Sequence, residues 1–222
     1  ELGAGRLGGG PAPVPVLDAA AARGISVVRS YGMSETAGGC VYDGLPLYGV
    51  EVRIDGDGGP GRITLGGATL ASGYRNPPTD DPFAEPGWFV TDDVGALDDS
   101  GRLQVLGRID DAISTGGLTV LPQPVEAALA AHPAVADCAV FAITDDSLGQ
   151  RVAAAVVLHP GSLAPTVADL REHVALTLPR TAAPRELHIL DELPRRGIGK
   201  TDRRALRARF DSRYPHNDIS TT

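Results

Sequence analysis

Apolar and polar positions along the chain follow two different periods, and the change between them divides the sequence near its middle. Across residues 50–107, apolar and polar positions alternate between glycine-rich turns, a pattern that predicts a small, mostly antiparallel β unit. Ahead of this unit, apolar residues at helical spacing predict a helix over 12–23. A β-branched run predicts a strand over 25–29 that leads into a loop at Tyr31.

Beyond residue 110 the helical and strand-like patterns are mixed. Helices are expected over 124–131, where a proline lies in the first turn, 167–178 and 202–210. Strands are expected over 135–143, 151–158 and 186–190. We therefore predict an α/β protein with one domain over 1–109, a small α+β domain over 110–213 and a frayed polar tail over 214–222.

The composition narrows the classes of function. Asp and Glu total 28 against 20 Lys and Arg, a formal net charge of −8, which argues against general nucleic-acid binding because that needs a basic face. The apolar runs are too short to span a bilayer. Two cysteines do not make a disulfide framework, and the five histidines lack metal-ligand spacing. We expect a cytoplasmic protein without nucleic-acid or membrane partners; the oligomeric state stays open, a homodimer included.

A single lysine, Lys200, stands among the basic residues, and all the others are arginine. Chance in a lysine-poor sequence is one explanation. The other is a site that needs a compact, flexible point charge, for which a planar guanidinium is no substitute. Glycines at 197 and 199 flank Lys200 and indicate a mobile loop that can carry the amine into a site.

Two glycine motifs are near misses. Residues 3–8 fit G-x-G-x-x-G, but a dinucleotide fingerprint follows a strand and only two residues precede this one. Residues 197–201 resemble the tail of a phosphate-binding P-loop. Pro194 stands where that loop needs a glycine and supplies no N–H to a phosphate. Neither motif predicts a nucleotide site by itself.

Four other segments, in a fixed order, carry the stronger chemical signal. Residues 31–36 offer an aromatic face for a base, hydroxyls for a phosphate and a carboxylate for Mg²⁺. Residues 87–93 end on two aspartates, and a carboxylate there can accept both hydrogen bonds of a ribose diol. Residues 107–111 form the third segment and the Lys200 loop the fourth. Each could be structural if taken singly, as a core aromatic, turn aspartates or a surface ion pair.

Together these segments resemble the adenylate-forming superfamily of acyl-CoA synthetases, peptide-synthetase adenylation domains and luciferases. The resemblance covers nearly the whole chain, from about residue 7 to about residue 210. It rests on aromatic-Gly-x-Ser-Glu-Thr, Trp-Phe-x-Thr-x-Asp, Gly-Arg-x-Asp-Asp and Pro-x-x-x-x-Gly-Lys at family-like separations. It implies that 1–109 is the C-terminal part of a large AMP-binding domain and that 110–213 is a mobile C-terminal domain.

The resemblance also implies roles for individual residues. Lys200 would be catalytic, bridging the attacking carboxylate and the α-phosphate, Glu35 would hold Mg²⁺, and Asp110 would be the hinge. The nucleotide would be bound by Gly9, Gly10, Tyr31, Gly32, Ser34, Thr36, Asp93 and Arg108, with Gly8 beside them. Gly116 and Gly117 would face the CoA channel, and Gly38, Gly39 and Tyr42 would line part of the acyl pocket.

The implied activity is ATP-dependent formation of an acyl-adenylate followed by transfer of the acyl group to CoA. Residues 31–44 are most similar to the o-succinylbenzoate–CoA ligases of actinobacteria, which act in menaquinone synthesis. Alternatives are another acyl-CoA synthetase, an adenylation domain that loads a carrier protein, or an inactive nucleotide-binding fragment. Two departures from the family pattern matter. Asp92 stands where glycine is usual, which leaves open whether Asp92 or Asp93 meets the ribose. The family's Ser/Thr/Gly-rich phosphate loop is absent from this sequence, so the chain alone is expected to turn over poorly.

Overall fold

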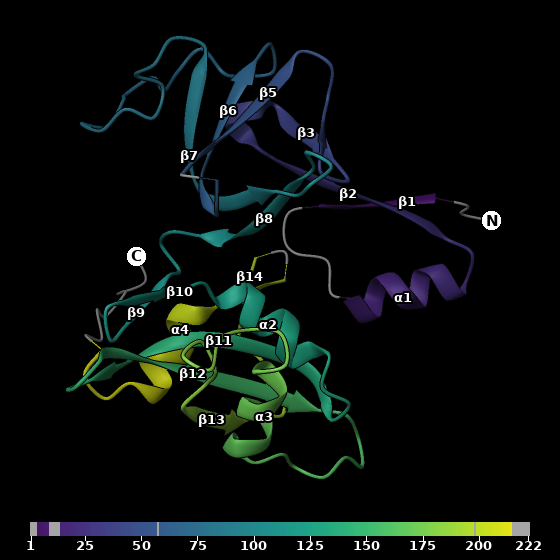
Figure 1. The fold of residues 1–222 in the computed structure, drawn as a ribbon, viewed down its shortest axis with the longest axis vertical. Coiled ribbons are helices and arrows are strands. Elements are labelled where there is room, and N and C mark those ends of the chain that lie inside the picture. Colours follow the sequence, from purple (N-terminus) through teal and green to yellow (C-terminus); the bar gives the residue numbers. More distant parts are fainter. Residues whose placement is uncertain (1–3, 9–13, 57, 198, 215–222) are drawn as a thin grey trace. The chain divides into compact units, whose positions relative to one another are not determined.

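The computed structural model describes residues 4–8, 14–56, 58–197 and 199–214. The chain divides into two compact units, Glu1–Asp110 and Asp111–Thr222, and each is described by itself (Figure 1). Strands predominate in the first unit, and the second combines sheet and helix. The structure therefore has the mixed α/β character that the sequence predicts.

The first sheet of unit 1 contains four strands in the order β1-β2-β3-β4. Strand β1 runs parallel to β2, and helix α1 lies between them in sequence; β2, β3 and β4 pair antiparallel. The helix predicted over 12–23 is confirmed for its described part. The bounds are β1 Ala4–Gly8, α1 Val14–Ala22, β2 Ser26–Met33, β3 Gly38–Tyr42 and β4 Leu45–Pro46.

The loop predicted at Tyr31 is wrong, because β2 continues through it to Met33. Tyr31 pairs with Val41, and the register shifts before Gly32 pairs with Gly39. A Cβ on Gly32 would lie 2.0 Å from the Gly38 carbonyl oxygen, so only glycine allows the two strands to approach this closely. The glycines of β3 hid this strand from a search for apolar alternation.

The second sheet of unit 1 is the predicted antiparallel unit, in the order β5-β6-β7-β8. Alternate residues of β6 and its neighbours enter a core that also contains Cys40 and Val41 of β3. Ile63 and Leu65 are fully buried in it, so the same core stabilises both sheets of the unit. The bounds are β5 Val50–Asp55, β6 Gly61–Gly67, β7 Trp88–Leu97 and β8 Leu103–Arg108.

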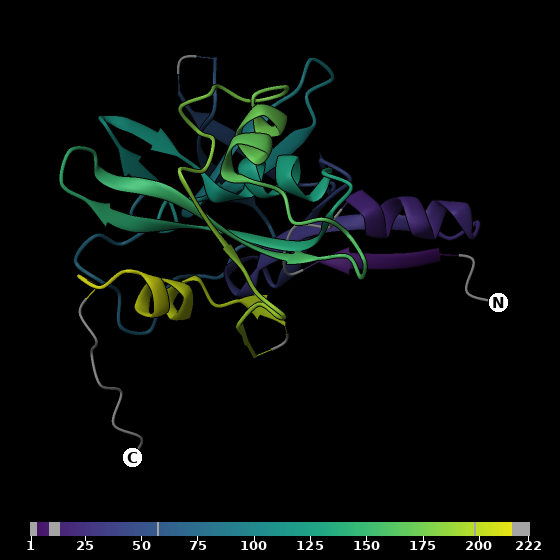
Figure 2. The same cartoon turned by 90° about the horizontal axis from the view of Figure 1, so that it is seen from below.

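Unit 2 is built on a sheet in the order β10-β9-β12-β11, with β13 parallel to β12. Helices α2 and α3 cover one face of this sheet, and α4 lies on the other (Figure 2). A separate two-stranded hairpin, β14–β15, leads into α4. The bounds are β9 Ile113–Thr115, β10 Leu118–Val120, α2 Pro122–Ala130, β11 Val135–Asp145, β12 Gly149–Leu158, α3 Val167–Val174, β13 Glu186–Ile189, β14 Arg195–Arg196, β15 Lys200–Thr201 and α4 Arg203–Phe210.

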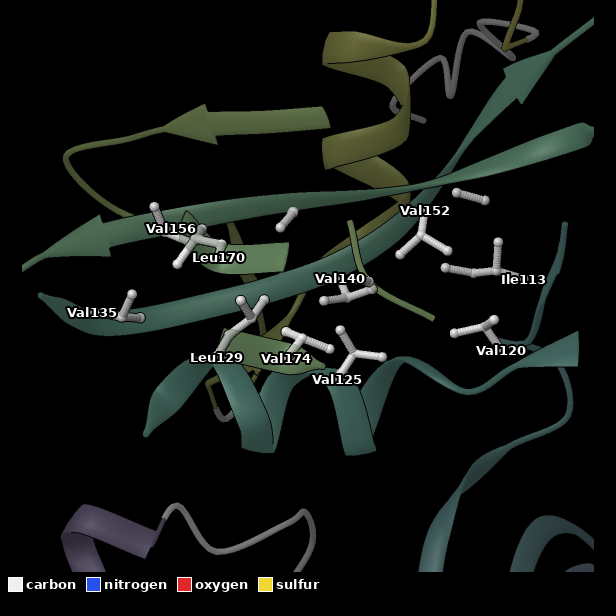
Figure 3. Close-up of a cluster of buried hydrophobic side chains, with 13 residues drawn as sticks. Ile113, Val120, Val125, Leu129, Val135, Val140, Val152, Val156, Leu170 and Val174 are labelled. Carbon is white, nitrogen blue, oxygen red and sulfur yellow. The ribbon is translucent and has the colours of Figure 1, made fainter. Parts of the chain in front are cut away.

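The core of unit 2 follows from the alternation of side chains along β11. Val140 points to the face where Val125 of α2 and Leu170 and Val174 of α3 pack (Figure 3). Phe141, the next residue, points to the opposite face and packs against α4. Both faces of the central strands are covered, which explains why their sequences read as continuous apolar runs.

The predicted helices and strands of unit 2 are confirmed, with one shortened. Helix α3 ends at Val174, one turn before the predicted Leu178, where turns lead to Pro179. A proline disfavours helical conformation in the residue before it, so Pro179 excludes Leu178 from the helix. Thr166 caps the other end, its hydroxyl accepting from the Asp169 N–H. Residues 215–222 of the predicted tail lie outside the described residues.

No helix in the described part of the chain is long and apolar enough to cross a membrane.

Candidate nucleotide site and the lysine hairpin

A hydrogen-bonded pair of side chains joins the first two candidate segments within unit 1. The Tyr31 hydroxyl donates to Asp93 Oδ2 at 2.7 Å. Tyr31 comes from β2 and Asp93 from β7, so the contact connects the two sheets of the unit. Burial, followed by the negative charge of Asp93, raises the pKa of Tyr31 well above its usual range. The phenol therefore stays protonated and remains a donor.

The third segment meets this pair through Arg108. Asp93 and Arg108 are register partners on β7 and β8, and Arg108 Nη1 lies 3.7 Å from Asp93 Oδ1. Arg108 Nη2 lies 2.7 Å from Asp110 Oδ2. Its three acidic neighbours raise the pKa of Arg108, Asp110 contributing most. The structure thus places three of the predicted residues, Tyr31, Asp93 and Arg108, in one cluster.

Asp92 and Asp93 differ in their surroundings because neighbouring residues of a strand face opposite ways. The side chain of Asp92 is 51% exposed and pairs with Arg62 at 3.0 Å, whereas that of Asp93 is 12% exposed. The Asp93 N–H donates to the Thr91 hydroxyl at 3.0 Å, and that hydroxyl donates to the Ile63 carbonyl at 2.7 Å. Asp93 is therefore largely buried, with Tyr31 bonded to its carboxylate, whereas Asp92 is half exposed and both of its carboxylate oxygens are paired with arginines.

The short helix η1, Ser34–Thr36, presents the remaining polar groups of the first segment. Ser34 is exposed, whereas Thr36 is buried. The Thr36 hydroxyl accepts from the Met33 N–H at 3.0 Å and donates to the Gly38 carbonyl at 2.7 Å. In this geometry Thr36 closes the turn, and Ser34 is the residue with its hydroxyl toward solvent.

Glu35, the predicted metal ligand, has a partner that the sequence did not reveal. Its Oε1 accepts from the Tyr74 hydroxyl at 2.7 Å, and this bond raises the pKa of Tyr74 to about 12. Tyr74 lies between β6 and β7, about forty residues from Glu35 in sequence. In the described part of the chain, His, Cys, Asp and Glu form no group of three that could hold a metal ion alone.

A glycine-lined cavity of about 370 Å³ lies on the first sheet of unit 1. Its lining includes Gly38 and Gly39, two residues predicted for the acyl pocket. A Cβ on Gly39 would lie 2.9 Å from the Tyr42 hydroxyl, so glycine keeps this space open. The other lining residues are Arg6, Gly8, Ser30 and Gly32. Sequence analysis missed Arg6 and Ser30, because only the pairing of β1 with β2 brings them here. The predicted residues Gly9 and Gly10 lie outside the described residues.

In unit 2, Lys200 lies on the β14–β15 hairpin and is exposed. Its strand neighbours are fixed: Arg195 donates to the Gly199 carbonyl at 2.7 Å and pairs with Asp137. Arg196 pairs with Asp202 at 3.3 Å. Among the residues that the structure describes, Lys200 has no ion-pair partner. The ammonium thus stands on a braced hairpin and is available to a ligand.

Gly116 and Gly117, predicted for the CoA channel, form the tight turn between β9 and β10. Their φ angles are 57° and 79°, which two consecutive glycines adopt without strain in a two-residue hairpin turn. The Gly116 N–H donates to the Leu148 carbonyl at 2.9 Å. The turn itself therefore accounts for glycine at both positions. The absence of side chains, which leaves the backbone open there, follows from the turn.

Residues 124–200 match the family described as the AMP-binding enzyme C-terminal domain. The chain is 68% identical to "Probable 2-succinylbenzoate–CoA ligase" of Mycobacterium tuberculosis over 95% of its length, which is 55% of that protein. It superimposes with a TM-score of 0.77 on o-succinylbenzoate CoA synthetase (MenE) from Bacillus subtilis in complex with the acyl-adenylate OSB-AMP. That likeness has 32% identity and covers 91% of this chain and 45% of the other.

Residues 124–200 thus carry the AMP-binding enzyme C-terminal domain, and nearly the whole chain is similar to proteins named 2-succinylbenzoate–CoA ligase. The chain spans about half the length of the curated relatives it matches. Its fold is also similar to that of proteins with different names, such as the amide bond synthetase McbA from Marinactinospora thermotolerans. That protein has a TM-score of 0.83 and 29% identity, over 93% of this chain and 46% of the other. Proteins with this fold carry different names, so the fold alone does not identify the acid or the acceptor.

Proposed function

We propose that the complete gene product activates o-succinylbenzoate with ATP and then transfers the acyl group to CoA, a step of menaquinone synthesis. The observation that carries this proposal is the 68% identity to a named 2-succinylbenzoate–CoA ligase over 95% of the chain. That range includes both the Tyr31–Asp93–Arg108 cluster and the lysine hairpin. A cytoplasmic location is consistent with this role and is part of the proposal.

In this proposal the cluster in unit 1 binds the nucleoside. Adenine stacks on Tyr31, whose ring is fixed because its hydroxyl is bonded to Asp93. Asp93 has a carboxylate with about four lone-pair sites; Tyr31 uses one of them, so acceptors remain for the ribose hydroxyls. Because Asp93 is largely buried beside Tyr31, whereas both oxygens of the exposed Asp92 are paired with arginines, we assign the ribose contact to Asp93.

In this proposal the residues of η1 would bind the phosphates of ATP and their Mg²⁺. Mg²⁺ is commonly held by one or two carboxylates together with substrate phosphates, and Glu35 supplies one carboxylate whose Oε1 is oriented by Tyr74. The residues present therefore fit a Mg²⁺–nucleotide complex, in which the ion offsets phosphate charge. Ser34 is placed to donate to a phosphate oxygen, and Thr36 holds the turn that carries both residues.

Lys200 supplies the charge for the first half-reaction. The attacking carboxylate and the α-phosphate repel each other, so a cation that contacts both stabilises the transition state more than the ground state. Unit 2 then turns about Asp110 for the second half-reaction. In that step the Gly116–Gly117 turn faces CoA, whose thiol takes the acyl group and releases AMP. The cavity at Gly38 and Gly39, with Tyr42, holds the acyl group through both half-reactions.

Pyrophosphate exchange with the complete gene product tests this proposal on a panel of acids. Exchange with o-succinylbenzoate and release of its CoA thioester support it. Exchange only with an amino acid or a fatty acid would instead support an adenylation domain that loads a carrier protein, or a different acyl-CoA synthetase. If no acid supports pyrophosphate exchange, the ligase activity is refuted and a nucleotide-binding role remains.

A further inference from the structure

All three side-chain nitrogens of Arg203 donate hydrogen bonds, and the proposed function gives this residue no role. Its Nη2 donates to both carboxylate oxygens of Glu126, at 2.7 and 2.8 Å. Its Nη1 donates to Asp111 Oδ2 at 3.1 Å, and its Nε donates to the Val140 carbonyl at 3.1 Å. Only a planar guanidinium can make these contacts at once, because its donors are fixed in a fork.

The partners of Arg203 come from three separate elements of unit 2. Asp111 is the first residue of the unit and follows the proposed hinge residue Asp110 directly. Glu126 is in α2, and Val140 is in the central strand β11. The side chains of Arg203, Glu126 and Asp111 are 20%, 15% and 31% exposed. Arg203 therefore links the start of the unit to its core in a partly dry environment, where such contacts are strong.

Glu126 depends on this arginine. Burial raises the pKa of Glu126, and Arg203 and the Val140 N–H, which donates to Oε1 at 2.8 Å, counteract the rise. The carboxylate would be left buried without a charge partner if Arg203 were removed. An uncharged replacement of the arginine is thus expected to loosen the junction of α2, α4 and the segment at Asp111 rather than leave it unchanged.

Arg203 also begins the helix on which the lysine hairpin ends. It is the first residue of α4 and follows Lys200 by three positions. Between them, Asp202 caps the helix: its side chain accepts from the Ala205 N–H at 3.0 Å, and its own N–H donates to the Pro194 carbonyl at 2.8 Å. The base of the hairpin is therefore joined to the helix terminus that Arg203 fixes.

We propose that Arg203 is a positioning residue for the first half-reaction: it fixes the base of the Lys200 hairpin to the residue that follows the hinge. The lysine and the hinge segment then move as one body, and the ammonium reaches the acid with a defined geometry. This inference rests on the proposed function, because it assumes that Lys200 acts in adenylation. Lys200 has no part in the second half-reaction, so the loss of Arg203 acts mainly on the first.

The test compares both half-reactions in the complete gene product. Arg203→Gln is expected to lower kcat for acyl-adenylate formation by between about tenfold and a hundredfold, the cost of misplacing a reacting group by about 1 Å. KM for ATP and the rate of thioester formation from supplied acyl-adenylate should change by no more than about twofold. Arg203→Lys, which keeps the charge and loses the fork, should recover part of the loss.

Arg204→Gln is the matched control, because Arg204 is the next residue of α4 and is exposed. It should leave both half-reactions unchanged. In a Lys200→Ala background, Arg203→Gln should lower adenylation no further, since it acts through the lysine. Equal loss of both half-reactions, or a further loss in that background, would overturn the proposal.

If Arg203→Gln does not fold, Glu126→Gln replaces it, and the same selective loss is required. A wild-type protein that is silent with every acid refutes the proposed function. An active wild type in which these variants show no selective loss refutes this inference alone.

Discussion

The assignment of the ribose contact to Asp93 rather than to Asp92 predicts a clear difference between two conservative variants. Asp93→Asn keeps an oxygen that can accept from Tyr31, so the 2.7 Å bond survives. It replaces one charged acceptor by an amide N–H₂, which cannot accept from a ribose hydroxyl. A hydrogen bond to a charged group contributes about 1.5–3 kcal/mol, so the dissociation constant of AMP should rise by about tenfold to a hundredfold.

Asp92→Asn is the matched control, since Asp92 is the adjacent residue and also lies near Arg108, at 3.4 Å. Its side chain is half exposed, and exposed ion pairs contribute about 0–1 kcal/mol. We expect its effect on AMP binding to stay below about fivefold. Titration calorimetry with the complete gene product and both variants measures the three dissociation constants directly.

A ribose analogue sharpens this comparison. In the wild type and in Asp92→Asn, 3′-deoxy-AMP or 2′-deoxy-AMP should bind more weakly than AMP. In Asp93→Asn, one of the two deoxy analogues should bind about as tightly as AMP. It is the analogue that lacks the hydroxyl bound by Asp93, because the variant has already lost the oxygen that accepts from that hydroxyl. A larger effect from Asp92→Asn, or full sensitivity to both deoxy analogues in Asp93→Asn, would show that the ribose is not held by Asp93.

Three further predictions concern the framework around the site. Gly32→Ala should destabilise the protein by at least about 2 kcal/mol in urea unfolding, since a Cβ there lies 2.0 Å from the Gly38 oxygen, whereas Gly5→Ala, with open space, should not. Because the pKa of Tyr31 is raised on folding, unfolding favours its ionised form above about pH 10, and the free energy of unfolding should fall as pH rises. Tyr31→Phe should remove up to about 1.4 kcal/mol per pH unit of that slope, and equal slopes would contradict the assignment. Burial raises the pKa of Cys138 to about 12, so iodoacetamide at pH 8 should label it in guanidinium but not in the native protein, as mass spectrometry can show.

The elements that were predicted well are those in which apolar residues recur with a single spacing, that of a strand or that of a helix. The β5–β8 sheet alternates cleanly because one of its faces enters a core, and α2 and α4 are short helices with clear starts. Strands β1 and β3 were missed because glycines interrupt them. Some of these glycines are required by close contacts that only the fold reveals: a Cβ on Gly8 would lie 2.4 Å from the Ser30 hydroxyl, and one on Gly39 would lie 2.9 Å from the Tyr42 hydroxyl. Leu178 was placed in a helix because it continues the helical spacing of Leu170 and Val174. It does pack on the same core as α3, but the chain reaches that core through turns.

Site residues that lie in a local sequence motif could be predicted. Contacts made by a partner that is distant in sequence could not. Motif spacing predicted Tyr31, Asp93 and Arg108 together, but only the fold shows their contacts and the different surroundings of Asp92 and Asp93. Tyr74 reaches Glu35 from a segment without regular structure, and no local pattern marks it. Arg203 was noticed only as part of a helix, because Asp111 and Glu126 lie 92 and 77 positions away.

We propose that one lysine of unit 2, Lys200, serves the first half-reaction and not the second. The most direct measurement compares wild type and Lys200→Ala in the complete gene product, with o-succinylbenzoate and ATP in one assay and with supplied acyl-adenylate and CoA in the other. The variant is expected to lose adenylation by at least about a hundredfold and to keep thioester formation near the wild-type rate. Equal loss in both assays, or unimpaired adenylation, would contradict this proposal.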